Sequence, residues 1–192
     1  MDKKVHVVFI VGGPGAGKGT ACKVLKEEFK YNHLSTGDIL RNIVKEQKNP
    51  KWKELQEKMN SGAFVSSSEL MGFVKDEFKA LAGQKVLLDG FPRNQENVDE
   101  WNKQMNDVAD VKALLYLDCK PETMKKRMLG RNEGRADDNE ETVKKRIENF
   151  VSSTIPVVEE FKKTGKVISV DAEKTAKEVY EEIAKKFKEK GL

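Results

Sequence analysis

The glycine-rich run from Gly12 to Thr20 is the feature that most restricts how this chain can fold. It reads Gly-Gly-Pro-Gly-Ala-Gly-Lys-Gly-Thr, follows the apolar stretch 5–11 and precedes a segment with helical periodicity. A strand, a glycine loop and a helix in this order let several backbone N–H groups surround a phosphate chain at the positive end of the helix dipole. Lys18 adds a full positive charge. The run therefore predicts a nucleotide-phosphate site rather than a turn that merely ends a strand.

The loop departs in one respect from the common phosphate-binding motif. In that motif the lysine is followed directly by Ser or Thr, whose hydroxyl binds Mg²⁺. Here Gly19 separates Lys18 from Thr20. We therefore expect the metal to be held mainly through water molecules.

The rest of the chain alternates apolar runs with helical patterns. Four further apolar runs lie at 33–35, 86–89, 113–118 and 167–170. This alternation predicts a parallel sheet covered by helices on both faces, and 192 residues fit a single domain, 1–192. The apolar spacing over 139–163 predicts a helix that Pro156 bends or breaks, and residues 176–187 predict an amphipathic packing helix.

The charge and the apolar content restrict the partners. Charged residues make up 35% of the chain, but the net charge is only +4, which a polyanionic small substrate explains as well as nucleic acid would. Trp52 and Trp101 are not interleaved with basic residues, so we expect them to pack helices. No stretch has the length of a membrane span or the pattern of a signal sequence. We expect a cytoplasmic enzyme without nucleic-acid or membrane partners, and entry into the nucleus stays open.

The two cysteines and the two histidines carry no recognisable metal pattern. Cys22 and Cys119 are expected to be buried, reduced thiols because their spacing is not that of a metal site. His6 and His33 lie within predicted strands, which favours structural roles for both.

Arginine is scarce in this chain. Six arginines stand against thirty lysines, and all six fall at loops or helix starts near the strand ends or in the polar segment 131–138. Arginine grips two phosphate oxygens at once, so these positions favour phosphate binding over solubility. Asp89 ends a buried strand just before Arg93, which makes its carboxylate a candidate to orient magnesium through water.

Three further motifs resemble those of nucleoside monophosphate kinases, the adenylate kinase and UMP/CMP kinase family. They are Ser35-Thr36-Gly37-Asp38 with Leu40-Arg41, Asp89-Gly90-Phe91-Pro92-Arg93, and Gly134-Arg135-Ala136-Asp137-Asp138-Asn139. With the glycine loop, they occur in the family's order and span nearly the whole chain. The resemblance implies an α/β P-loop NTPase fold of three layers with a central five-stranded parallel sheet. It also implies a helical monophosphate-binding flap at 35–65 and a short lid at 131–138 as mobile insertions.

The resemblance further implies in-line transfer of the ATP γ-phosphoryl group to a nucleoside monophosphate, with Mg²⁺ as cofactor and a monomeric enzyme. ATP would be bound by Gly15, Ala16, Gly17, Lys18, Gly19, Thr20, Arg127, Arg131 and Lys174. The monophosphate would be bound by Thr36, Arg41, Ala63, Phe64, Val65, Gly90, Phe91, Pro92, Arg93, Asn97, Arg135 and Arg146. Catalysis would depend on Lys18, Arg93, Arg131, Arg135 and Arg146.

The acceptor base is the point on which the motifs disagree. The residue four positions after Arg93 would read the base, and Asn97 there resembles UMP/CMP kinases, whereas adenylate kinases typically carry glutamine. Thr36 and Ser66 are unlike the usual UMP/CMP kinase pattern. The balance favours UMP or CMP, with dCMP also considered. An adenylate kinase that accepts AMP is the main alternative, and a non-catalytic ATP-binding sensor is the second.

Overall fold

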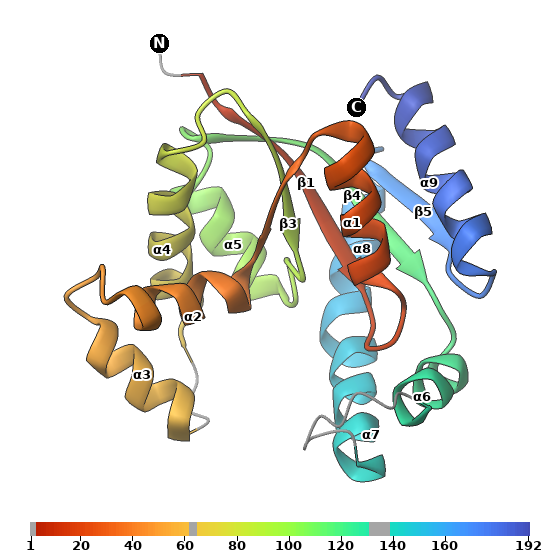
Figure 1. The fold of residues 1–192 in the computed structure, drawn as a ribbon, viewed down its shortest axis with the longest axis horizontal. Helices are drawn as coiled ribbons and strands as arrows, with labels where there is room; N and C mark the ends of the chain where they lie inside the picture. Colours follow the sequence, from red (N-terminus) through yellow and green to blue (C-terminus); the bar gives the residue numbers. More distant parts are fainter. Residues whose placement is uncertain (1–2, 62–64, 131–138) are drawn as a thin grey trace.

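A computed structural model describes residues 3–61, 65–130 and 139–192, and five parallel strands form its centre (Figure 1). The strands are β1 (Val5–Gly12), β2 (Asn32–Ser35), β3 (Lys85–Asp89), β4 (Ala109–Asp118) and β5 (Val167–Asp171). They lie in the order β2-β3-β1-β4-β5, and all four pairings are parallel. The sheet predicted from the alternating pattern is confirmed.

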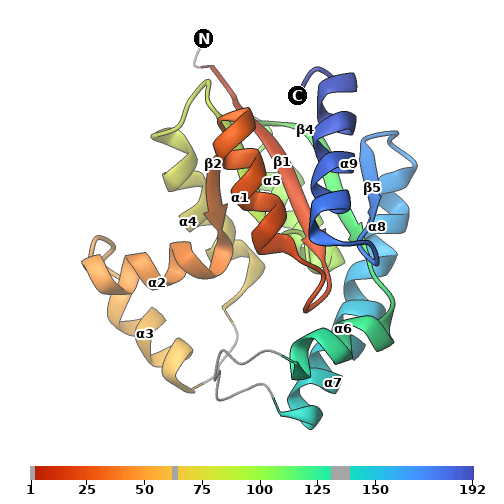
Figure 2. The same cartoon turned by 45° about the vertical axis from the view of Figure 1, so that its right-hand side comes forward.

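Helices connect the strands and lie on both faces of the sheet (Figures 1 and 2). In the described residues they are α1 (Lys18–Phe29), α2 (Thr36–Glu46), α3 (Trp52–Ser61), α4 (Ser67–Lys79), α5 (Gln95–Gln104), α6 (Pro121–Leu129), α7 (Glu140–Asn149), α8 (Ile155–Lys162) and α9 (Ala176–Glu189). Helices α1 and α9 cover one face, whereas α5 and α8 cover the other. None of these helices is long and apolar enough to cross a membrane.

Aromatic side chains fill the core on the α5 and α8 face. Phe9 of β1 is 2% exposed and contacts the rings of Phe91, Trp101 and Phe161 edge-on at 4.8–6.0 Å between centroids. Ring pairs of this geometry add to the free energy gained by burying their area. The packing role predicted for Trp101 is confirmed.

Strand β4 begins four residues earlier than the apolar run predicted. Val5 of β1 pairs with Ala109, and the register shifts between Val7 and Val8 at a bulge-like irregularity. The half-exposed Asp110 and the exposed Lys112 interrupt the apolar run there. A continuous apolar run does not reveal a strand whose first residues are polar, although these residues pair through their backbone as the apolar ones do.

Pro156 interrupts the α-helical hydrogen bonding, as predicted. Helix α7 passes into a π-helical segment, η1 (Phe150–Thr154), and α8 starts with Pro156 in its first turn. Because proline has no N–H to donate, the α-helical hydrogen bonding is interrupted before it, and the wider π turn occupies that position.

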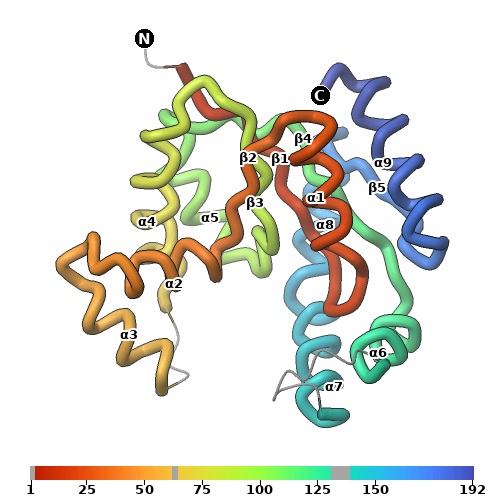
Figure 3. The backbone as a smooth tube through the Cα atoms, in the orientation of Figure 1, coloured from red at the N-terminus to blue at the C-terminus, as the bar shows by residue number. Residues whose placement is uncertain are grey.

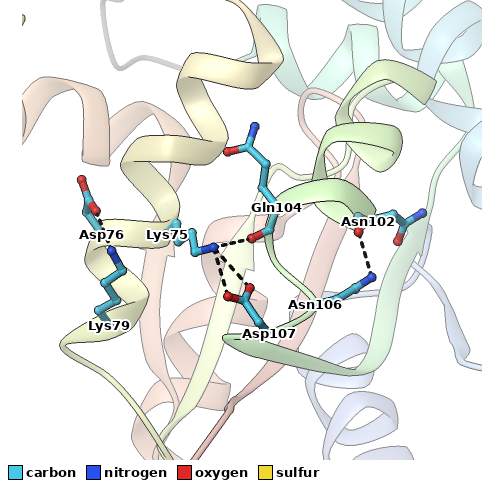
Figure 4. Close-up of polar contacts among 7 residues, drawn as sticks. All are labelled: Lys75, Asp76, Lys79, Asn102, Gln104, Asn106 and Asp107. Atoms are coloured by element: carbon cyan, nitrogen blue, oxygen red, sulfur yellow. Dashed lines mark hydrogen bonds and ion pairs between the residues drawn. The ribbon is translucent and has the colours of Figure 1, made fainter. Parts of the chain in front are cut away.

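Helices α2 and α3 extend from the sheet on one side, and α6 and α7 extend on the other, both at the end where the glycine loop lies (Figure 3). Helix α4 follows α3 and is fixed to α5 by Lys75 (Figure 4). Its Nζ donates to the Gln104 carbonyl at 2.9 Å and to both Asp107 carboxylate oxygens at 3.2 Å. The outer helices α2 and α3 are thus attached to an anchored helix pair.

Candidate active site

The phosphate loop runs from the end of β1 to the start of α1. Gly15 and Gly17 have φ values of 76° and 91°, which favour glycine. At Gly13 an added Cβ would lie 2.4 Å from the buried Met124 sulfur of α6. The glycines therefore let the backbone curve tightly and let α6 pack against the loop.

Lys18 is the first residue of α1 and turns back over the loop. Its Nζ donates a hydrogen bond to the Gly12 carbonyl at 2.9 Å. Burial lowers the pKa of Lys18, and nearby Arg93 and Arg146 lower it further, while Asp89 and Cys22 act in the opposite direction. An anion placed beside Lys18 would relieve this crowding of positive charge.

A cavity of about 360 Å³ opens beside the loop. Its lining includes Gly12, Lys18, Gly90, Pro92, Arg93, Arg146 and Thr154. Arg93 reaches solvent in the cavity, yet enough protein surrounds it that desolvation lowers its pKa. The cavity brings together three cations predicted from the sequence, Lys18, Arg93 and Arg146, and is therefore suited to an anion that carries several charges.

Three hydrogen bonds hold Arg93 in position. Thr154 of η1 donates from Oγ1 to the Arg93 carbonyl at 2.7 Å, and the Arg93 N–H donates to Asn97 Oδ1 at 3.0 Å. The Arg93 Nε donates to the Gly90 carbonyl at 2.9 Å. The sequence analysis missed Thr154, because nothing distinguishes this threonine from any other in a helical pattern. Its contact with Arg93 depends on the fold, which brings η1 close to the loop after β3.

Asp89 lies at the carboxyl edge of the sheet, where Ile10 of β1 is its partner in register. Its Oδ2 lies 3.1 Å from His33 Nε2, and its Oδ1 is buried without a hydrogen-bond partner in the described part of the chain. The Asp89 carboxylate raises the pKa of Lys18 and of Arg93, against the lowering caused by burial. The contact with His33 was not predicted.

A second cavity, of about 270 Å³, lies on the other side of the loop. Ala16, Gly17, Thr20, Arg127, Ala172 and Lys174 line it, together with residues of α9. Arg127 is held in this lining by two hydrogen bonds. Its Nη2 donates to the Ala172 carbonyl at 2.8 Å, and its Nη1 donates to the Gly15 carbonyl at 3.4 Å. The Lys174 ammonium donates to Glu182 at 3.4 Å, so its charge is paired within the protein.

The flap residues Thr36, Arg41 and Val65 are not among the residues that line the cavity with Lys18 and Arg93. Thr36 is buried at the start of α2, and Val65 is half-buried just before α4. Arg41 donates to Asp38 on the same helix and does not line the cavity with Lys18 and Arg93. Phe91, 1% exposed, belongs to the core and does not line this cavity, whereas its neighbours Gly90 and Pro92 do. Ala63, Phe64, Arg131 and Arg135 lie outside the described residues.

A parallel sheet, a glycine loop with its lysine, and two cavities on either side of that loop define a P-loop nucleotide-binding protein. Residues 10–166 match the family model described as "Adenylate kinase". The chain belongs to the adenylate kinase family. It is a nucleoside monophosphate kinase that uses ATP.

Full-length relatives share this assignment. The chain is 42% identical over 198 aligned residues to "UMP-CMP kinase" of Bos taurus, an alignment that covers 98% of this chain and 100% of the relative. The enzyme of the same name from Mus musculus is 43% identical with the same coverage. "UMP-CMP kinase 3" of Oryza sativa subsp. japonica is 40% identical over 95% of this chain and 85% of its own length.

Proposed function

We propose that the protein transfers the γ-phosphoryl group of ATP to UMP or CMP, giving ADP and the nucleoside diphosphate. The observation that carries the choice of acceptor is the identity of about 42% over nearly the whole chain with relatives named UMP-CMP kinase. Asn97, four positions after Arg93, agrees with it.

The two cavities suit a donor and an acceptor that meet at the phosphate loop. The cavity with Arg127 and Ala172 would take the adenosine of ATP, and the cavity with Arg93 and Arg146 would take the acceptor phosphate. Lys18 lines the cavity with Arg93 and Arg146 and would follow the transferred group. Transfer of this kind requires positioning and charge neutralisation rather than a protein nucleophile, because the acceptor phosphate is itself nucleophilic.

We also propose Mg²⁺ as the cofactor that accompanies ATP. The buried, unpartnered Oδ1 of Asp89 fits this group, since a carboxylate oxygen is the kind of hard acceptor that holds a magnesium-bound water. When bound, the metal would supply charge neutralisation on the donor phosphates. Asp89 would orient its water, and Thr20 would lie beside the donor.

Asn97 would read the pyrimidine edge through the parts of its amide that the protein leaves unused. Its Oδ1 accepts from the Arg93 N–H, and its Nδ2 donates to Ser67 Oγ at 2.8 Å. An amide has two N–H donors and two acceptor lone pairs, so one of each remains for a base. Because the Arg93 backbone N–H donates to Asn97, recognition of the base would be linked to the position of the arginine that binds the acceptor phosphate.

A coupled assay of ADP release with ATP and Mg²⁺ tests the proposal. UMP, CMP, dCMP, AMP and GMP are compared as acceptors at equal concentrations. We expect turnover with UMP and CMP to exceed turnover with AMP by at least about tenfold, the size of discrimination that one hydrogen-bonding residue supplies. Faster turnover with AMP would make this an adenylate kinase. ATP binding without turnover on any acceptor would instead support a sensor.

A further inference from the structure

Cys22, His33 and Asp89 form a cluster of metal-ligating side chains beside the phosphate loop. Their ligand atoms, the Cys22 sulfur, a His33 ring nitrogen and an Asp89 carboxylate oxygen, all lie within 4.8 Å of one another. They come from three separate elements, α1, β2 and the end of β3. Among the described residues 3–61, 65–130 and 139–192, these three side chains form a group that could hold a metal ion.

We propose that Cys22, His33 and Asp89 bind a thiophilic divalent cation of the zinc class, and that the bound cation withdraws Asp89 from the phosphate site. A thiolate, an imidazole and a carboxylate are ligands that zinc takes in tetrahedral sites with one position left to water. Mg²⁺ requires oxygen ligands and would not use the sulfur. The site is thus chemically distinct from the magnesium site proposed above, although the two share Asp89.

The distances fit coordination after a small adjustment. Zinc bonds of about 2.0–2.3 Å place tetrahedral ligands about 3.5 Å apart. His33 Nε2 and Asp89 Oδ2 are already 3.1 Å apart, and the Cys22 sulfur lies within 4.8 Å of the other two ligand atoms, so it has to approach them by about 1.3 Å at most. Cys22 lies one helical turn from Lys18 on α1, which limits the movement to side-chain rotation.

The surrounding charge also fits. Lys18 and Arg93 would repel a bare cation, but the Cys22 thiolate and the Asp89 carboxylate carry two negative charges that balance a divalent ion. The sulfur–metal bond forms as the thiol loses its proton to solvent. Burial and the neighbouring Asp89 carboxylate raise the pKa of the Cys22 thiol, and a bound cation acts against both effects. The buried divalent cation and its two anionic ligands therefore neutralise one another.

Inhibition is the expected consequence, and this part rests on the proposed function. Asp89 cannot both ligate the thiophilic cation and orient a magnesium water with full charge. We expect saturating Zn²⁺ to lower turnover by about 10- to 100-fold, the usual effect of losing a group that orients a metal. The binding itself needs no nucleotide, so it is measured independently of the reaction.

The binding experiment titrates the full, reduced chain with Co²⁺ and Zn²⁺ alone, without nucleotide. The expected result is one equivalent bound and a thiolate-to-cobalt charge-transfer absorption that Zn²⁺ abolishes. Cys22→Ser and His33→Gln should each weaken binding by at least about tenfold. Cys119→Ser and His6→Gln are matched controls, since they change the other cysteine and the other histidine, and should bind as the wild type does. No charge-transfer band in the wild type, or binding unchanged in Cys22→Ser, would overturn the site.

The inhibition experiment compares each variant with its own rate in the absence of Zn²⁺. Chelation of ATP by Zn²⁺ is the same for every variant, so relief of inhibition in Cys22→Ser alone reports the protein site. Equal inhibition of the wild type, Cys22→Ser and Cys119→Ser would overturn the proposed withdrawal of Asp89. If the band forms in a wild type that has no kinase activity, the proposed function fails and the metal site stands.

Discussion

The Asn97 Nδ2 donates a hydrogen bond to Ser67 Oγ at 2.8 Å, and both residues are buried. Ser67 is the first residue of α4, whereas Asn97 lies in the first turn of α5 and also accepts from the Arg93 N–H. One amide therefore joins the helix that follows the flap to the residue expected to grip the acceptor phosphate.

Ser67→Ala should weaken both stability and monophosphate binding. The variant leaves a buried amide N–H without a partner, which costs about 1–3 kcal/mol in the free energy of unfolding. We expect the KM for UMP to rise more than kcat falls, because Asn97 gains freedom to rotate. Denaturant unfolding and steady-state kinetics measure the two effects. Ser68→Ala is the control, since that hydroxyl accepts only an exposed contact from Gln104 at 3.3 Å. A loss of stability with unchanged KM would show that Ser67 is only structural.

Thr154→Val tests how strongly η1 positions Arg93. Valine keeps the shape of threonine but cannot donate to the Arg93 carbonyl, so about 1 kcal/mol of positioning energy, roughly fivefold in kcat/KM for the monophosphate, should be lost. Thr164→Val removes a hydrogen bond of the same length, 2.7 Å from Thr164 Oγ1 to the Phe161 carbonyl, and Thr164 does not line the cavity with Lys18 and Arg93. A similar decrease in both variants would contradict the positioning role.

Lys18→Met should abolish most activity while it raises the melting temperature. The loss of a charge that follows the moving phosphoryl group lowers kcat by about a thousandfold or more, by analogy with arginine fingers. Burial that lowers the pKa of Lys18 means that the folded state tolerates its charge poorly. Thermal unfolding without nucleotide measures the gain, and the exposed Lys23→Met on the same helix is the control. Near-normal turnover in Lys18→Met would refute the phosphate-site assignment.

The pH dependence follows from the same lowered pKa. Lys18 must be protonated to attract phosphate, so kcat/KM for ATP should fall at a pH below 10.5, the ordinary lysine pKa. Between the lowered pKa and 10.5 the unfolded chain binds more protons at this site than the folded one, so the contribution of Lys18 to stability rises with pH. The stability advantage of Lys18→Met should therefore shrink as the pH rises. Unfolding curves for both proteins across the alkaline range check this sign, and an advantage that grows would contradict it.

The glycine run and the apolar strands were enough to predict the parallel sheet and the nearness of Lys18 to Arg93, because these features depend on local patterns and on the rule that parallel strands end at one edge. The placement of Arg146 beside them was predicted only by the resemblance of the motifs to those of the family. The contact of His33 with Asp89 could not be predicted, because it depends on β2 lying beside β3 although the two are separated by more than fifty residues in the chain. Thr154 lies in the π-helical segment before Pro156. The spacing of apolar residues does not indicate a π turn, so the contact of Thr154 with Arg93 could not be predicted either.

The aromatic contacts of Phe187 place the end of α9. Phe187 meets Phe29 and Tyr31, just before β2 begins, and β1 also begins at that edge of the sheet. Both ends of the described chain therefore leave the molecule at the edge opposite the phosphate loop. A purification tag, a surface linker or a fused reporter attached at either end would leave both nucleotide cavities open, so the enzyme can be immobilised in either orientation for binding measurements.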